Sequence, residues 1–163
     1  MADEATITLS ATLMPEDIQL TEVAGTFTFT PSDADDKWFF NRVRVSSTSS
    51  DLIASNYVGD PLADGTASAA VSTSDKVKFL WIYNTGTTDG SSSSSDSVYI
   101  VIDGGTAAND AADAIEVPAG MTWYGKMPNQ TVANIHAITG VANGGGTSSA
   151  VVECHLAGIL DDV

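Results

Sequence analysis

Few residues of this 163-residue chain have side chains suited to nucleophilic or acid–base chemistry. The chain contains two histidines, His136 and His155, and one cysteine, Cys154. Both histidines fall within predicted strands, and successive residues of a strand point to opposite faces, so Cys154 and His155 cannot form a local dyad. The sequence also lacks the GxSxG, HExxH and GxxxxGKS/T motifs of hydrolases, zinc proteases and phosphate-binding loops. We therefore expect no enzymatic activity and no cofactor.

Carboxylates gather in one loop at Asp33, Asp35 and Asp36, where calcium could find several of the oxygen ligands that it takes. This DADD segment lacks the twelve-residue loop and the closing Glu of an EF-hand, so a solvated acidic loop is favoured over a calcium site. The single cysteine excludes an internal disulfide and a multi-cysteine zinc site. Within the apolar run AVVECHLAGIL, Cys154 is predicted to be a small buried hydrophobe.

Aromatic residues could form a platform on which sugar rings stack. Trp and Tyr are also the residues that β-sandwich cores and subunit interfaces use for large, rigid apolar area, and this second role is favoured. The cluster comprises Trp81, Tyr83, Tyr99, Trp123 and Tyr124.

The charge of the chain is strongly negative, with 21 acidic and 6 basic residues and a net charge of -15. Nucleic-acid binding rests on a patch of Lys and Arg, so DNA and RNA are excluded as partners. Arg42 and Arg44 stand out, because alternation in WFFNRVRVS puts both on one face of a strand. They are expected either to pair with carboxylates on a neighbouring strand or to contact an acidic partner.

Two features of the sequence predict where the protein is located in the cell. No apolar run approaches the ~20 residues of a membrane span, so no membrane association is expected. The beginning of the chain, MADEATITLS, has no basic segment followed by an apolar core, so no signal peptide is expected. We expect synthesis and folding in the cytoplasm.

The chain is organised around KVKFLWIYNTG, residues 76–86, which is apolar on both parities and so predicts a central strand. Residues 97–103 are expected to pair with it across a mobile Ser/Gly-rich tip, residues 84–96. TITLSATL, residues 6–13, alternates with Ile7 and Leu9 on its apolar face and predicts a half-buried strand.

Roughly eight to ten strands separated by turn signals every ~8–12 residues predict an all-β, antiparallel β-sandwich. A jelly roll of about eight strands is preferred over an immunoglobulin-like sandwich. One domain is expected over residues 1–163, with residues 1–13 as a candidate contact arm.

Three segments resemble small β-sandwich virion proteins of tailed bacteriophages: KVKFLWIYNTG, SVYIVIDGG and IEVPAGMTWYGKMPNQTVANIHAIT. In that group a strand ending in Asn-Thr-Gly, a strand ending near Asp-Gly and a Pro-Ala-Gly turn recur. The resemblance runs from Lys76 to the C-terminus, about half of the chain, and carries over no functional residue. It implies a capsid decoration (cement) protein, synthesised in the host cytoplasm, that binds the outer surface of a phage head and stabilises it.

The implied partners are the major capsid protein or other virion subunits, and a homo-oligomer, with a trimer favoured. Candidate contact residues are Arg42 and Arg44 on one strand and Ile7 and Leu9 on the N-terminal strand. The alternative function is a carbohydrate-binding or host-recognition β-sandwich module that uses the aromatic platform.

Overall fold

A computed structural model describes residues 5–13, 21–29, 37–53, 71–109, 114–146 and 148–161. The chain divides into two compact units, Met1–Asp36 and Lys37–Val163. The sequence predicted one domain. The division arises because, among the described residues, the two strands of the first unit pair with each other and form a sheet of their own.

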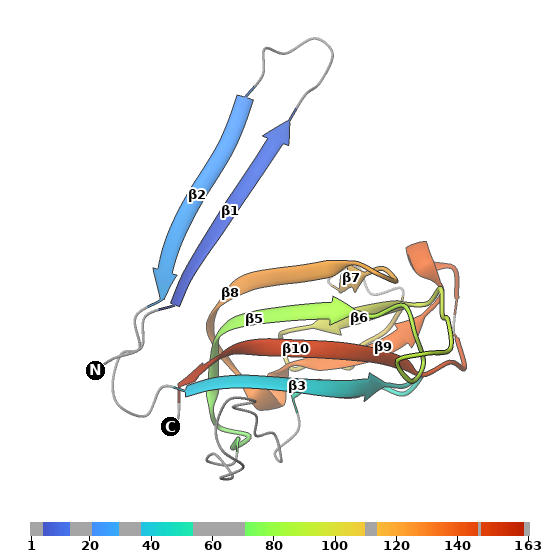
Figure 1. The fold of residues 1–163 in the computed structure, drawn as a ribbon. Helices are drawn as coiled ribbons and strands as arrows, with labels where there is room; N and C mark the ends of the chain where they lie inside the picture. Colours follow the sequence, from blue (N-terminus) through green and yellow to red (C-terminus); the bar gives the residue numbers. More distant parts are fainter. Residues whose placement is uncertain are drawn as a thin grey trace. The chain divides into compact units, whose positions relative to one another are not determined.

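The first unit contains β1 (Ala5–Leu13) and β2 (Thr21–Phe29), which pair antiparallel (Figure 1). The strand predicted from residue 6 to residue 13 is therefore present. The register pairs Ile7 with Phe27 and Leu9 with Gly25.

The second unit consists of two four-stranded antiparallel sheets (Figure 1). The first sheet has the order β3–β10–β5–β8, with β3 at Lys37–Val45, β10 at Val152–Asp161, β5 at Lys76–Asn84 and β8 at Thr122–Thr131. The second sheet has the order β4–β9–β6–β7, with β4 at Ser50–Asp51, β9 at His136–Gly140, β6 at Ser97–Val101 and β7 at Ile115–Val117.

The strands of this unit pair as a nested series: β3 with β10, β4 with β9, β5 with β8, and β6 with β7. Two further pairings, β10 with β5 and β9 with β6, fold this long ribbon onto itself. Eight antiparallel strands wound into two facing sheets in this way form a jelly roll. The prediction of a jelly-roll-like antiparallel β-sandwich is confirmed.

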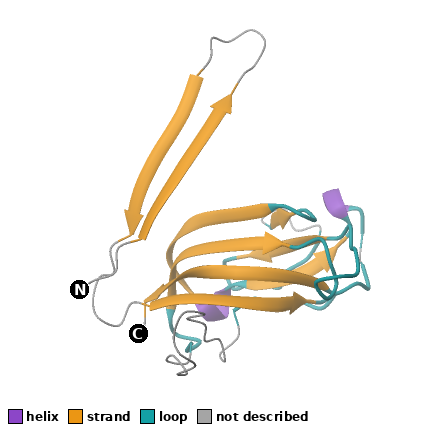
Figure 2. Cartoon of the chain, viewed as in Figure 1, coloured by secondary structure: helices purple, strands orange, loops and turns teal. Residues whose placement is uncertain are grey.

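Helical structure in the described residues is confined to two 3₁₀ turns, η1 (Val132–Asn134) and η2 (Ala142–Gly144) (Figure 2). No helix in this part of the chain is long and apolar enough to cross a membrane.

The hydrophobic core lies between the two sheets and draws side chains from both of them. Leu80 and Ile82 of β5 and Val98 and Ile100 of β6 are fully buried in it. Burial of each such side chain contributes about 1.5–3 kcal/mol. Cys154 of β10 is also fully buried there, as predicted, and burial raises the pKa of its thiol to about 12.

The alternation in β3 is confirmed: Phe39, Val43 and Val45 are buried and Phe40, Arg42 and Arg44 are exposed. β5 is an inner strand between β10 and β8, as expected of the central strand. Its inner face is fully buried, whereas Trp81 and Tyr83 on its outer face are only half-buried.

The expected pairing of residues 97–103 with the central strand was wrong. β5 and β6 do not pair, because the connection from Asn84 to Ser97 crosses from one sheet to the other. The Ser/Gly-rich segment forms a hydrogen-bonded loop, in which Thr87 pairs with Ser93 in an isolated bridge. Its backbone also bonds to β10, since Glu153 N donates to Thr87 O at 2.8 Å.

Candidate functional site

The register of the sheet β3–β10–β5–β8 sets two rows of residues across its outer face. One row is Arg42, His155, Tyr83 and Thr122. The neighbouring row is Phe40, Ala157, Trp81 and Tyr124. Directly paired residues of an antiparallel sheet share a face, so these rows form one continuous surface over four strands. We name it the aromatic–arginine face, with the members Phe40, Arg42, Arg44, Trp81, Tyr83, Tyr124 and His155.

The rings of this face contact one another in sequence. Phe40 and Tyr83 approach His155 edge to face, with centroid distances of 6.3 Å and 6.0 Å. Trp81 lies 6.3 Å from Tyr83 in a tilted arrangement. Edge-to-face pairs at this distance are favourable beyond the area that they bury. The rings therefore support one another on β3, β10 and β5 and present a preformed apolar strip.

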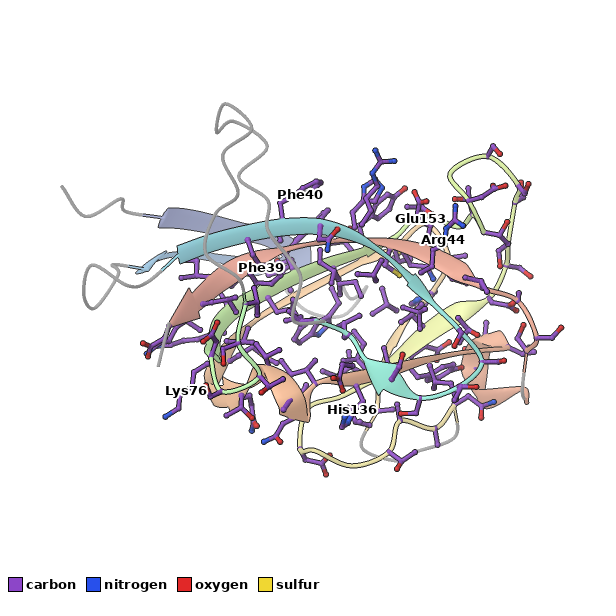
Figure 3. All side chains as sticks on the ribbon, turned by 90° about the horizontal axis from the view of Figure 1, so that it is seen from below. Phe39, Phe40, Arg44, Lys76, His136 and Glu153 are labelled. Carbon is purple, nitrogen blue, oxygen red and sulfur yellow. The ribbon has the colours of Figure 1, made fainter. Side chains whose placement is uncertain are left out.

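The strip is open to contact at both ends. Phe40 is 37% exposed and Tyr124 is 36% exposed. In Figure 3, Phe40 lies on the outer side of β3, and His136 lies on the other side of the sandwich. A contiguous patch of exposed aromatic residues is typical of a surface that binds a protein or a ligand.

The two arginines border this strip on β3, and both are exposed. Neither guanidinium forms an ion pair with any residue that the structure describes, although Arg44 is directly paired with Glu153. The Glu153 carboxylate lies 3.5 Å from Nε2 of His155, and the residue is only 7% exposed. The cross-strand pairing considered for the arginines is therefore not formed with Glu153.

All six Lys and Arg residues of the chain belong to strands of this sheet: Lys37, Arg42 and Arg44 on β3, Lys76 and Lys78 on β5, and Lys126 on β8. The strands of the other sheet contain none. Lys78 bonds Asp161 at 2.5 Å. All basic residues of this strongly acidic protein thus belong to strands of one sheet.

The outer side of the opposite sheet is covered by loops and carries carboxylates. Tyr99 of β6 is buried, its hydroxyl donates to Val141 O at 2.7 Å, and Gly144 N donates to that hydroxyl at 2.9 Å. Burial raises the pKa of Tyr99. Glu116 of β7 accepts a hydrogen bond from Asn143 N at 2.8 Å, and this bond lowers the pKa of its carboxyl.

The ring of His136, on β9 of that sheet, is held by contacts at both of its nitrogen atoms. Its Nδ1 lies 2.7 Å from Gly105 O, and its Nε2 lies 3.2 Å from Oδ1 of Asp51. Both ring nitrogens therefore face oxygen atoms, and the ring links β4, β9 and the loop after β6. Cys154 and His155 point to opposite faces, as predicted, because Cys154 is in the core and His155 contacts outer-face rings.

A pocket of about 520 Å³ lies between the edge strands β3 and β4. Arg44 borders both this pocket and the aromatic–arginine face. The full lining is Val43, Arg44, Val45, Ser50, Asp51, Leu52 and Ala137.

The structure divides the predicted aromatic cluster. Trp81, Tyr83 and Tyr124 share the outer face, whereas Tyr99 belongs to the other sheet and Trp123 packs against the core. Phe40 and His155 belong to the face but were missed by sequence reasoning. Phe40 could have been found, because it has the same parity as Arg42 in an alternating strand.

The remaining predicted site residues are placed only in part. Asp33, Asp35 and Asp36, the calcium candidates, lie outside the described residues. Ile7 and Leu9 are located by the register of β1 and β2 alone. Among the residues that the structure describes, no group of three or more His, Cys, Asp or Glu side chains could hold a metal ion.

Comparison of the chain with family models, with curated proteins and with solved structures finds no match. Function must therefore be inferred from the residues themselves.

Proposed function

We propose that the chain is a structural subunit of a virion, a capsid decoration (cement) protein that binds the outer surface of a phage head and stabilises it. It acts without catalysis, by burying its surface against neighbouring subunits. Its partners are the major capsid protein or other virion subunits, and it works as a homo-oligomer, with a trimer favoured. Its location is the capsid surface.

The observation that carries this proposal is the aromatic–arginine face. Trp, Tyr and Arg are the residues that dominate the binding energy of protein interfaces. Here Trp81, Tyr83 and Arg42 lie on one sheet face, supported by ring contacts. The jelly roll is also an architecture that viral capsid proteins use, although that likeness is one of fold alone. The resemblance of residues 76–163 to phage virion proteins points the same way.

The proposal is tested on the particles released from cells that carry the gene. Particles are separated on a density gradient, and the fractions are probed with an antibody raised against the purified chain. We expect the chain to sediment with the particles at a constant ratio to the main shell protein. We also expect particles stripped of it to lose their contents at a lower temperature. Recovery of the chain only among free proteins would contradict the proposal.

A second function, recognition of a carbohydrate, is favoured by the position of Trp81, Tyr83 and Tyr124 on one open face, because ring faces bind sugars by stacking. Tryptophan fluorescence distinguishes the two functions. If a glycan binds this face, emission changes on adding it, and the change disappears in Trp81→Phe but persists in Trp123→Phe, whose ring packs against the core. If no glycan changes the emission, carbohydrate recognition is excluded and protein binding is retained.

A further inference from the structure

We infer that the aromatic–arginine face binds a second copy of the chain, on the acidic outer side of its sheet β4–β9–β6–β7. This inference rests on the proposed function, because it assumes that the aromatic–arginine face binds a protein. It adds the identity of the partner and the surface that the partner offers.

The first argument is the separation of charge across the sandwich. Every Lys and Arg of the chain lies in the sheet β3–β10–β5–β8, and Arg42 and Arg44 are exposed there without an ion-pair partner among the described residues. The strands of the opposite sheet have no basic residue. The exposed guanidinium groups on the outer face of the first sheet and the carboxylates of the opposite sheet are complementary in charge, and complementary potentials bring such surfaces together.

The second argument is that the opposite side offers accessible carboxylates. Asp51 is paired with His136 in register and so shares the outer face of that sheet, and its side chain is 49% exposed. Asp103 is exposed in the loop that follows β6. His136 bonds both Asp51 and Gly105, which keeps these two carboxylates in the same region of the surface. Carboxylates are the groups that a guanidinium binds in bidentate geometry.

The third argument is that the composition of the aromatic–arginine face suits a protein partner. Phe40, Trp81 and Tyr124 form an apolar centre, and the arginines lie beside it on β3. An apolar centre with a charged rim is the composition of a protein interface. Repulsion between copies with a net charge of -15 acts against association, but salt screens such long-range repulsion far more than it screens close contacts.

The two surfaces differ, so the contact is heterologous. Each copy offers its aromatic–arginine face to one neighbour and its acidic side to another. A heterologous contact closes into a ring when the rotation between neighbours allows it. The trimer favoured for a decoration protein is one such ring.

The test uses the full chain and measures its mass by sedimentation velocity and light scattering over a wide range of protein concentrations. We expect concentration-dependent association. Arg42→Glu is expected to weaken this association by roughly a hundredfold, since it places like charges opposite each other. The matched control is Lys76→Glu, which changes the net charge equally. Lys76 lies at the beginning of β5 in register with Asp161, away from the row of Arg42, His155 and Tyr83, so association is expected to be nearly unchanged.

A mixing experiment identifies the second surface. Arg42→Glu/Arg44→Glu and Asp51→Lys/Asp103→Lys are each expected to associate poorly alone and to associate with each other when mixed, because the charges are then exchanged across the contact. Circular dichroism melting checks that each variant is folded. If the double variant Asp51→Lys/Asp103→Lys unfolds because Asp51 no longer contacts His136, the single variant Asp103→Lys is used in its place.

Two results would overturn the inference: a monomer at every concentration, or an oligomer that neither Arg42→Glu nor Asp103→Lys affects. The proposed function fails by a different result, the absence of the chain from particles. A chain found on particles but monomeric in solution would therefore refute the self-association and keep the virion role.

Discussion

The side-chain amide of Asn84, at the end of β5, donates a hydrogen bond of 3.0 Å to the carbonyl oxygen of Val117, at the end of β7 in the opposite sheet. The same nitrogen donates to Asp96 O at 3.0 Å, and the side-chain oxygen accepts from Gly86 N at 3.0 Å. Asn84 is fully buried. One polar side chain thus joins both sheets at the end of the sandwich where the β5–β6 loop crosses over.

Replacing Asn84 with alanine should destabilise the fold strongly. The substitution removes three hydrogen bonds and leaves Val117 O, Asp96 O and Gly86 N without this partner. Because buried polar groups that lose their partner cost about 1–3 kcal/mol each, we expect Asn84→Ala to lower the free energy of unfolding by about 3 kcal/mol. Urea denaturation measures the change. Thr88→Ala is the control, since no described hydrogen bond involves the Thr88 hydroxyl, and a loss in Asn84→Ala no larger than in this control would contradict the role of Asn84.

Gly158 of β10 is expected to tolerate no side chain. A Cβ atom at this position would collide with the backbone oxygen of Phe79 and would lie 2.8 Å from Cζ of Phe39. The oxygen belongs to the neighbouring strand and cannot move without disturbing the ladder, so Gly158→Ala should cost about 1–3 kcal/mol. Thermal melting of Gly158→Ala and of Ala157→Ser, a change on the outer face beside it, measures the difference. Equal melting temperatures would show that β10 shifts to accept the methyl group.

Strand parity could be predicted from the sequence, because it depends on alternation alone. The sequence alone could place Arg42 and Arg44 on one face of their strand and Val43 and Val45 on the other, without knowledge of any other strand. The pairing of strands could not be predicted, because residues far apart in sequence decide it. β5 and β6 are neighbours in the chain and were expected to pair, yet they belong to opposite sheets, where β5 pairs with β10 and β8 and β6 pairs with β9 and β7.

Only part of the candidate site could be predicted, because its assembly also depends on the pairing of strands that are far apart in the sequence. Arg42, Trp81 and Tyr83 were identified as residues that could bind a partner, each from its own strand. Their assembly into one face depends on the register of β3 with β10 and of β10 with β5, in which His155 lies between Arg42 and Tyr83. No local signal in the sequence gives this register.

The thiol of Cys154 should be unreactive until the protein unfolds. Burial raises its pKa from 9.0 to about 12. A thiol reagent at pH 8 should therefore label the native protein only as fast as the protein opens, and should label it at once in urea. Rapid labelling of the native protein would show that β10 is accessible.

The same shift predicts how stability depends on pH. The unfolded thiol loses its proton near pH 9 and the folded thiol near pH 12. The contribution of the buried thiol is therefore complete below pH 9 and declines above it by about 1.4 kcal/mol per pH unit. Comparison of urea unfolding for the native chain and Cys154→Ala isolates this decline from other groups that titrate at high pH. Parallel pH profiles for the two proteins would contradict it.

The carboxylate of Asp89 should hold the Ser-rich loop in its folded form. Its Oδ1 accepts hydrogen bonds from Ser91 N at 3.0 Å and from Ser92 N at 2.7 Å, and both serine hydroxyls bond the carboxylate as well. These bonds, the one from Ser92 N first, lower the pKa of Asp89 from 3.8 to about 2. The stabilising effect is therefore present above pH 3.8 and is lost as the pH falls through 2.

Carboxyl ¹³C chemical shifts measure this pKa directly, and the urea-unfolded chain supplies the reference. We expect Asp89 to titrate well below its unfolded value in the native protein. We also expect the amide protons of Ser91 and Ser92 to exchange faster in Asp89→Ala, because those N–H groups then lose their acceptor. If Asp89 titrates alike in the folded and unfolded chains, its hydrogen bonds do not order the loop, and the mobile tip predicted from composition would describe residues 84–96 better.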